Sequence, residues 1–311
     1  MDQILQNSLN IKISSAFISY MVSVKLNGGL GNQMFQYAAA RYVAQQKNQK
    51  LIIDSTFLKY YPIHQSNTRR DYELNHFNVS AQVLDHKNKY VLLLLSNKLV
   101  FKLVEIIKKL YKNIIIINEN NFFASKALEK NYILEGYFQN EVYFKDIAAT
   151  IHDEFSLKND LDPQNAKLAQ IMVNENSVSL HVRRGDYTNV NNSTVYHICT
   201  KEYFLSAIDY VIQRIQNPTF YIFSDDMDWV KANIILDYPF TYITHNTGAS
   251  SYIDLVLMSK CKHNIISNST FSWWGAWLNR NNSKVVVAPK FWFKNSKEND
   301  DFTLPSDWAR L

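Results

Sequence analysis

The chain has 311 residues and a mass of 36.3 kDa, enough for two α/β domains or one large one. A hydrophobic content of 47% excludes global disorder, and a net charge of +5 is too small to suggest nucleic acid as a partner. Two cysteines, Cys199 and Cys261, are too few for a disulfide framework or a cysteine metal site, so we expect a reducing cytoplasm.

The first twenty residues show little pattern and lack the charged start and apolar run of a signal peptide. We expect a weakly structured extension over residues 1–20, with Met21 standing directly before the first strand. Residues 90–110 are apolar but are interrupted by asparagine, lysine and glutamate, so they predict a basic amphipathic helix and not a membrane span. This helix would pack on its own domain or, as the less favoured alternative, touch an anionic membrane at its cytoplasmic face.

The pattern after Met21 predicts a βαβ unit: a strand over 22–26, a loop reading NGGLGNQ over 27–33, a helical run over 34–44 and a strand over 51–53. The loop lacks the Gly-Lys-Ser/Thr ending of a P-loop, and Met34 stands where a dinucleotide fingerprint has Gly or Ala. Three glycines within four positions are typical of a loop where the backbone approaches a ligand closely, whereas a tight turn would need only one.

A stretch dense in aromatic residues, LEGYFQNEVYF over 134–144, follows a predicted buried strand over 114–117. Aromatic rings offer flat apolar faces with polar edges, so the stretch could line a sugar site. An aromatic cluster in the core is the alternative.

The second half alternates strands and helices regularly, which predicts a doubly wound parallel sheet. The boundary between the two halves is expected near 150–175. Strands are expected over 177–182, 220–223, 240–244, 264–266 and 285–287, and helices near 200–216, 228–235, 251–260 and 271–278.

The strand over 177–182 ends abruptly in Arg183, Arg184, Gly185 and Asp186. Ligands of open α/β sheets bind outside the carboxyl ends of the strands, and an arginine fork matches phosphate oxygens. These residues therefore suggest a site for an anionic ligand. A solvated surface turn is the alternative.

Two more strand ends carry polar clusters, at 224–226 and 267–272. Because the carboxyl ends of parallel strands open on one edge, we expect all three clusters to converge. The Ser-Asn-Ser-Thr run from Ser267 stands at a predicted helix start, where hydroxyls, backbone amides and the helix dipole can hold phosphate. Ordinary helix capping is compatible with this role.

The acidic pair Asp226 and Asp228 resembles the metal motif of one class of sugar-nucleotide transferases. The nearby arginines already offer charge to a diphosphate, so we favour a non-metal role, in which Asp225 or Asp226 binds hydroxyl or ring N–H donors of the nucleoside or caps a helix. His181 alternates with apolar strand positions beside the arginines and is interpreted as a hydrogen-bonding group on the ligand side. No HExxH, CxxC or GxSxG pattern supports zinc hydrolysis or a serine nucleophile.

Several segments together resemble the bacterial α-1,2-fucosyltransferases of glycosyltransferase family 11. These are NGGLGNQMFQYAAA at 27–40, GYFQNEVYF at 136–144, HVRRGDY at 181–187, FYIFSDD at 220–226 and SNSTFSWWGAWLN at 267–279. The resemblance covers nearly the whole chain from Met21, in order and spacing.

The resemblance implies a GT-B architecture, with two Rossmann-like doubly wound domains facing a central cleft. We expect an acceptor-side domain over 21–160 and a GDP-fucose-binding domain over 161–311. The implied reaction is the metal-independent, inverting transfer of L-fucose from GDP-fucose to the 2-hydroxyl of a galactose-terminated glycan, with no cofactor.

By the same resemblance, Arg183 would neutralise the diphosphate as GDP leaves, and Asp186 would help to shape the site. On chemistry alone, Asp186 or Glu135 is a candidate for the base that takes the acceptor proton. The remaining expected donor-binding residues are Asn27, Gly28, Gly29, Gly31, Asn32, Gln33, His181, Arg184, Ser224, Asp225, Asp226, Ser267, Asn268, Ser269 and Thr270.

Two alternatives stay open at this point. A metal-dependent GT-A-like transferase would use Asp226 and Asp228, and a chelator would inhibit it. A non-catalytic protein that binds sugar nucleotides would keep the phosphate site without turnover.

Overall fold

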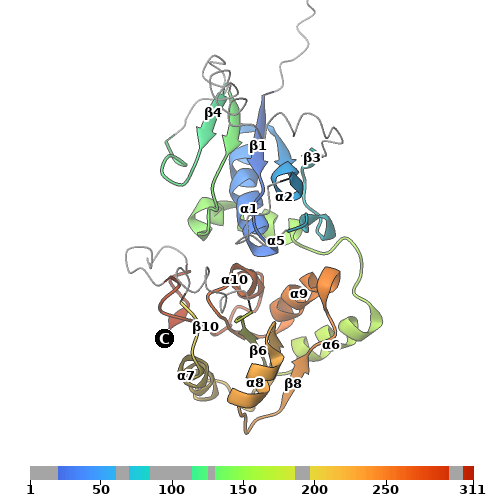
Figure 1. Cartoon of the computed structure of the whole chain (residues 1–311), viewed down its shortest axis with the longest axis vertical. Helices are drawn as coiled ribbons and strands as arrows, with labels where there is room; N and C mark the ends of the chain where they lie inside the picture. The colour runs from blue at the N-terminus through green and yellow to red at the C-terminus, as the bar shows by residue number, and fades with distance from the viewer. Residues whose placement is uncertain (1–19, 61–69, 85–113, 125–129, 186–196, 294–303) are drawn as a thin grey trace, which may run out of the picture.

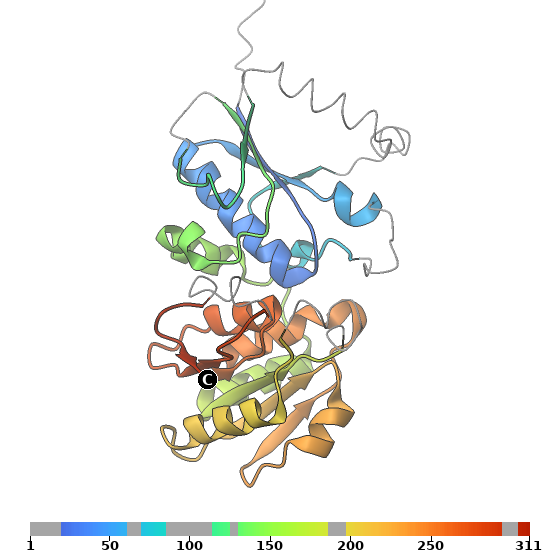
Figure 2. The same cartoon turned by 60° about the vertical axis from the view of Figure 1, so that its left-hand side comes forward.

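A computed structural model describes residues 20–60, 70–84, 114–124, 130–185, 197–293 and 304–311. Three expectations fall outside these residues: nearly all of the N-terminal extension, the basic helix over 90–110, and Asp186. Figures 1 and 2 show two α/β lobes, one above the other, each built on its own sheet. Among the described residues, no helix combines the length and the hydrophobicity that crossing a membrane requires.

The first lobe holds a five-stranded parallel sheet in the order β3-β2-β1-β5-β4. Its strands are β1 (Met21–Lys25), β2 (Lys50–Asp54), β3 (Gln82–Leu84), β4 (Ile114–Ile117) and β5 (Asn131–Leu134). The β-branched runs of β2 and β4 suit a packed pleated surface, and both lie where the sequence predicts strands. The long helix α1 (Leu30–Lys47) connects β1 to β2, as expected for a βαβ unit. It begins four residues earlier than predicted, after the N-cap Gly29, so residues 30–33 of the expected loop form the first turn of α1. The short helices are α2 (Thr56–Tyr60), η1 (Leu74–His76), η2 (Glu141–Tyr143), η3 (Lys145–Ile147) and α5 (Ala148–Glu154).

The second lobe holds a six-stranded parallel sheet in the order β11-β10-β9-β6-β7-β8. Its strands are β6 (Ser177–Val182), β7 (Thr219–Ser224), β8 (Phe240–Ile243), β9 (His263–Ile265), β10 (Val286–Ala288) and β11 (Ala309–Arg310). Its helices are α6 (Pro163–Asn174), α7 (Lys201–Ile212), α8 (Met227–Asn233), η5 (Gly248–Ser250), α9 (Tyr252–Lys260) and α10 (Thr270–Trp277). The expected strand and helix repeats are therefore confirmed, with boundaries shifted by a few residues.

Strand β6 is buried at every position, although its sequence alternates polar and apolar residues. Central strands of parallel sheets have both faces covered, so the polar positions must find partners inside. Ser177 Oγ donates to the Met172 carbonyl, and Ser179 Oγ accepts from Asn264 Nδ2 at 2.7 Å. The alternation therefore reflects internal hydrogen bonds and not a solvent-facing side.

The two lobes share one hydrophobic core, because α10 packs against α1 across the boundary. The buried rings of Trp273 and Trp274 lie 4.5 and 4.9 Å from the ring of Phe35 in α1. Trp274 also stacks on Phe144, with ring centroids 5.2 Å apart. Most of the aromatic stretch over 134–144 thus belongs to a core that joins the lobes, as the core alternative predicted.

Candidate active site

The turn that follows β6 is built around one carboxylate, that of Asp225 after β7. Its Oδ1 accepts from the backbone N–H of Arg184 at 2.9 Å, and its Oδ2 accepts from that of Gly185 at 3.0 Å. The same Oδ2 lies 3.0 Å from Arg183 Nη1. A side chain at position 185 would have its Cβ 2.6 Å from this oxygen, so any other residue there would displace the Asp225 carboxylate. Asp225 therefore fixes the arginine turn from within.

Arg184 is fixed by a different pair of residues. Its guanidinium carbon lies 4.0 Å from the centre of the Trp229 ring, a cation–π contact, and its Nε lies 3.5 Å from Asp226 Oδ2. Asp226 Oδ1 also accepts from the Trp229 backbone N–H at 3.2 Å and so caps α8. Helix capping, one of the two non-metal roles expected for Asp226, is confirmed. Asp228 is exposed on the first turn of α8.

His181 lies on β6, with its ring buried between the arginine turn and α10. Burial, with a smaller contribution from the charge of Arg183, lowers the pKa of His181 to about 3, so the imidazole is neutral at pH 7. Its Nδ1 is buried and has no hydrogen-bond partner in the described part of the chain. The ring of Phe271 lies 5.8 Å away. His181 is therefore a neutral polar group whose buried Nδ1 has no partner among the described residues.

The first three residues of the Ser-Asn-Ser-Thr run are buried, and only Thr270 is partly exposed. Ser267 Oγ accepts from the Arg183 backbone N–H at 3.0 Å and donates to the His181 carbonyl at 2.8 Å. Asn268 is fully buried and donates to backbone carbonyls, including that of Trp292 at 2.9 Å. Ser269 begins α10 without a side-chain cap, and Thr270 is partly exposed. Ser267 and Asn268 thus shape the site, while Ser269 and Thr270 stand at an uncapped helix N-terminus.

The glycine loop of the first lobe meets that same N-terminus. The Trp274 indole Nε1 donates to the Gly31 carbonyl at 3.0 Å. A Cβ on Gly31 would lie 2.5 Å from the Thr270 carbonyl carbon and 2.6 Å from the Phe271 nitrogen. Gly31 therefore serves the close contact between the lobes.

The other two glycines of the loop differ from Gly31. Gly28 has a φ of +82°, which side chains rarely adopt, and a Cβ there would lie 2.5 Å from Asn32 Nδ2. Gly29 leaves open space: the nearest atom to its would-be Cβ is Arg70 Nε at 4.0 Å. Of the three, only Gly29 leaves room where a ligand can approach the backbone.

Asn32 and Gln33 were expected in the glycine loop but lie in the first turn of α1, where their side chains hold neighbouring segments. Gln33 is fully buried and donates to the carbonyls of Gly28 and Asp71 at 3.0 and 2.8 Å, while its oxygen accepts from the Glu73 N–H at 3.0 Å. Asn32 Oδ1 accepts from Gln139 Nε2 at 2.9 Å. Gln33 and Asn32 thus fix the segments on either side of the loop.

Glu135 is exposed directly after β5, at the carboxyl edge of the first sheet. The next segment is tied to the loop region by two bonds: Gln36 Nε2 donates to the Gly136 carbonyl at 3.1 Å, and Asn27 Nδ2 donates to the Tyr137 hydroxyl at 3.0 Å. Glu135 therefore lies beside the glycine loop. Ser224 completes the expected set: its hydroxyl donates to the Val182 carbonyl and accepts from the Asp226 N–H, both at 2.9 Å.

Asp254, on the first turn of α9, is a residue that the sequence analysis did not single out. Its Oδ1 accepts from Asn246 Nδ2 at 2.8 Å, and Asn246 in turn bonds to the buried Asn165 at 2.9 Å. Burial raises the pKa of Asp254 to about 7, with Asn246 opposing the shift. Nothing in the sequence of α9 marks this position, because the signal lies in its partners: Asn246 in the loop after β8 and Asn165 in α6.

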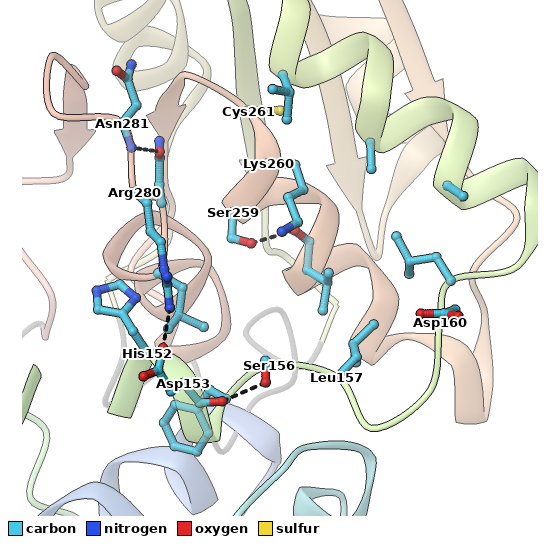
Figure 3. Close-up of a pocket in the computed structure, with 18 of the residues that line it drawn as sticks. His152, Asp153, Ser156, Leu157, Asp160, Ser259, Lys260, Cys261, Arg280 and Asn281 are labelled. Atoms are coloured by element: carbon cyan, nitrogen blue, oxygen red, sulfur yellow. Dashed lines mark hydrogen bonds and ion pairs between the residues drawn. The ribbon is translucent and has the colours of Figure 1, made fainter. Parts of the chain in front are cut away.

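A large open groove of about 1180 Å³ lies beyond the C-terminal end of α10, away from the arginine turn. In Figure 3, Arg280 reaches across it to Asp153, with Nη2 and Oδ1 3.0 Å apart. None of the residues expected to bind the donor lines this groove. Within the described ranges, no group of three or more His, Cys, Asp or Glu side chains is placed to hold a metal ion.

The comparisons with known proteins agree with this architecture. The chain is 34% identical over 311 residues to the O-antigen biosynthesis glycosyltransferase WbnK of Escherichia coli, covering 92% of this chain and 99% of that protein. It is 32% identical over 300 residues to an alpha-1,2-colitosyltransferase of the same organism, covering 94% and 99%.

Among solved structures, the fucosyltransferase NodZ from Bradyrhizobium aligns with a TM-score of 0.50 at 13% identity, covering 82% of this chain and 92% of NodZ. NodZ alpha-1,6-fucosyltransferase co-crystallised with GDP aligns with a TM-score of 0.51 at 14% identity, covering 82% and 91%. At these identities the likeness concerns the fold alone, which is of the GT-B type and not that of a GT-A-like transferase. The family model of glycosyl transferase family 11 matches residues 4–311, and the chain therefore belongs to glycosyltransferase family 11.

Proposed function

We propose that this chain transfers L-fucose from GDP-β-L-fucose to the 2-hydroxyl of a terminal galactose on an oligosaccharide, with inversion and release of GDP. One observation carries the proposal: Arg183 stands at the carboxyl end of β6, paired with Asp225 and hydrogen-bonded through its backbone to the segment that starts α10. The arrangement suits a leaving diphosphate, in a chain that belongs to family 11.

The chemistry requires stabilised negative charge on the leaving group. As the bond between the fucose C1 and the β-phosphate oxygen breaks, the sugar becomes cationic and the diphosphate gains charge. A guanidinium held in place before the reaction stabilises that charge by roughly 3 kcal/mol. The uncapped N-terminus of α10, at Ser269, adds backbone N–H donors and the positive end of the helix dipole. We assign the diphosphate to Arg183 and this helix end.

The guanine end of the donor needs a hydrogen-bond acceptor, and three carboxylates lie near the carboxyl edge of the second sheet. Asp225 is occupied by the arginine turn, and Asp226 caps α8. Asp254 accepts from Asn246, and burial raises its pKa to about 7, so a further hydrogen-bond donor would stabilise its charged form. Guanine offers two adjacent N–H groups that one carboxylate can accept. We therefore assign guanine recognition to Asp254, in place of the two aspartates expected from the sequence.

The acceptor side needs a base. The acceptor 2-hydroxyl attacks C1 of fucose, its proton passes to a carboxylate, and the C1–O bond to the β-phosphate breaks as GDP leaves. Glu135 is exposed at the carboxyl edge of the first sheet, and Asp186 follows the arginine turn. We retain both as candidates for this role.

A colitosyl donor is the second candidate, and the 32% identical alpha-1,2-colitosyltransferase favours it specifically. Colitose is fucose without the 3-hydroxyl, so the two donors share the diphosphate and guanine contacts. Offering GDP-fucose and GDP-colitose at equal concentration would separate them, because a site built to bond the 3-hydroxyl rejects the analogue that lacks it.

We propose that the reaction needs no divalent metal. Asp226 is engaged with α8 and Arg184, and Asp228 is exposed on the helix surface, so the two do not form a joint oxygen site. Arg183 supplies the charge that a metal would otherwise supply.

The experiment is a transfer assay with GDP-fucose, lactose and a panel of β-galactosides, followed by NMR assignment of the new linkage. We expect an α-1,2 linkage to galactose. A product linked at another hydroxyl would contradict the assigned reaction. Tight GDP-fucose binding without any product would favour the non-catalytic binding protein.

A further inference from the structure

One aromatic residue of the stretch over 134–144 stays outside the shared core. Phe138 and Phe144 are fully buried and Tyr143 is nearly so, whereas Tyr137 is 45% exposed. Tyr137 follows the carboxyl end of β5, and its partly exposed ring is available to contact a ligand.

The backbone of Tyr137 is held in place by Glu119, from the loop after β4. Glu119 Oε1 accepts from the backbone N–H of Tyr137 at 2.7 Å and from that of Phe138 at 3.1 Å. A side chain at Gly136 would have its Cβ 2.5 Å from the same carboxylate, so glycine allows this close approach of Glu119 to the backbone. The phenol oxygen accepts from Asn27 Nδ2 at 3.0 Å, which fixes the far end of the ring.

This position lies beside the proposed reaction centre. Asn27 begins the glycine loop, and Gly31 of that loop contacts the N-terminus of α10. Gln139 donates to Asn32 in the first turn of α1, which ties the segment to the loop on its other side. The candidate base Glu135 is two residues before Tyr137 in the chain. The ring is thus a fixed apolar face at the edge of the first lobe.

We propose that Tyr137 is the platform on which the acceptor sugar stacks, which gives to this one residue the sugar-binding role considered for the whole stretch over 134–144. The inference rests on the proposed function. A galactopyranoside has one face made of C–H groups, and an aromatic ring binds such a face while its hydroxyl edge stays in water. Because the ring is already held at both ends, little conformational entropy is lost when the sugar binds.

The test compares initial rates of the wild-type chain, Tyr137→Ala and Tyr137→Phe over a range of lactose or another accepted β-galactoside. Phe240→Ala is the matched control. Phe240 is similarly exposed, at 42%, but it is the first residue of β8 and so lies at the amino edge of the second sheet, whereas the arginine turn lies at the carboxyl edge. GDP affinity is measured by calorimetry for all four proteins.

We expect Tyr137→Ala to raise the acceptor KM about tenfold, which corresponds to roughly 1.4 kcal/mol. The kcat and the GDP affinity should change much less, a split that general misfolding would not produce. Tyr137→Phe keeps the ring and should stay within about threefold of wild type, and Phe240→Ala should match wild type.

An unchanged acceptor KM in Tyr137→Ala, with an active wild-type enzyme, would overturn this inference and leave the proposed function standing. A wild-type chain that binds GDP but transfers to no galactoside would overturn both.

Discussion

The glycine loop of the first lobe and the arginine turn of the second lobe both follow a strand at the carboxyl edge of its sheet, but they are organised differently. In the first lobe, the side-chain amides of Gln33 and Asn32 bond to backbone and side chains of neighbouring segments. In the second lobe, Asp225 holds the backbone of the turn while the guanidiniums of Arg183 and Arg184 supply charge.

The difference indicates that the two lobes contribute differently to ligand binding. Neutral amides fix geometry without adding a field, so the first lobe supplies shape and a surface for a neutral sugar. The second lobe places cations and a helix N-terminus where an anion can bind. The α10 helix joins the two, because its N-terminus belongs to the charged site while its tryptophans lie in the shared core.

The largest effect on turnover is expected from substitutions of Arg183 in the arginine turn. Arg183→Ala should lower kcat about 100- to 1000-fold, since it removes stabilisation of the leaving diphosphate. Arg183→Lys should also be severely impaired, because lysine lacks the planar fork. The melting temperature should change little, as Asp225 keeps its two backbone donors. Near-normal turnover by a folded Arg183→Ala protein would contradict the assignment.

Gly31 lies at the contact between the lobes and Gly29 does not, so substitutions at these two glycines should differ in their effect on stability. Gly31→Ala places a Cβ within 2.6 Å of the α10 backbone and should cost about 1 to 3 kcal/mol of stability. Gly29→Ala meets only Arg70 Nε at 4.0 Å and should leave the melting temperature unchanged. Thermal unfolding of both variants tests this, and equal stability of the two would show that the close contact is not required.

If Asp254 binds guanine, GDP affinity should fall about tenfold for each pH unit below the pKa of Asp254. Asp254 has a pKa raised to about 7, so the free carboxyl is largely protonated below that pH and cannot accept from guanine. GDP affinity should therefore rise with pH towards 7 and then level off. Asp254→Asn should bind GDP more weakly and lose this dependence.

The stability of the unliganded protein should fall as pH rises, whereas GDP affinity rises. The folded state holds the Asp254 proton at pH values where the unfolded state, with an ordinary pKa of 3.8, has released it. Unliganded protein should therefore lose stability as pH rises from about 4 to about 7, and Asp254→Asn should lack this contribution. A GDP affinity that is flat with pH in the wild type would remove Asp254 from the site.

The smallest effect is expected at Trp274. Trp274→Phe keeps an aromatic ring in the shared core but removes the indole N–H that donates to the Gly31 carbonyl. The loss should be about 1 to 2 kcal/mol of unfolding free energy, measured by denaturant titration. The Arg183-dependent step should persist, and a loss of turnover without a loss of stability would mean that this bond positions the site directly.

The repeating elements of both lobes could be predicted because strands such as Ile114–Ile117 and Ser177–Val182 carry strong local patterns. Strand β5, helix α6 and the edge strands β3 and β11 were not predicted, since they are short or weakly patterned and are defined by their neighbours. The convergence of the arginine turn, the aspartates and the Ser-Asn-Ser-Thr run followed from the geometry of parallel sheets, and the structure confirms it.

The contacts that each of those residues makes in the folded chain could not be predicted. Whether Asp225 faces a ligand or a backbone N–H depends on a turn 40 residues away, and Gly31 owes its place to a helix more than 200 residues away. Asp254 carries no local signal, because its burial and its Asn246 partner arise only in the folded chain.

The metal-independent, arginine-assisted transfer is best tested by measuring GDP release from GDP-fucose, with and without lactose, in EDTA and then with added manganese. We expect lactose-dependent release that EDTA does not change, because Arg183 and the α10 N-terminus supply the charge. Release that requires manganese would contradict this expectation and would return Asp226 and Asp228 to the centre of the mechanism.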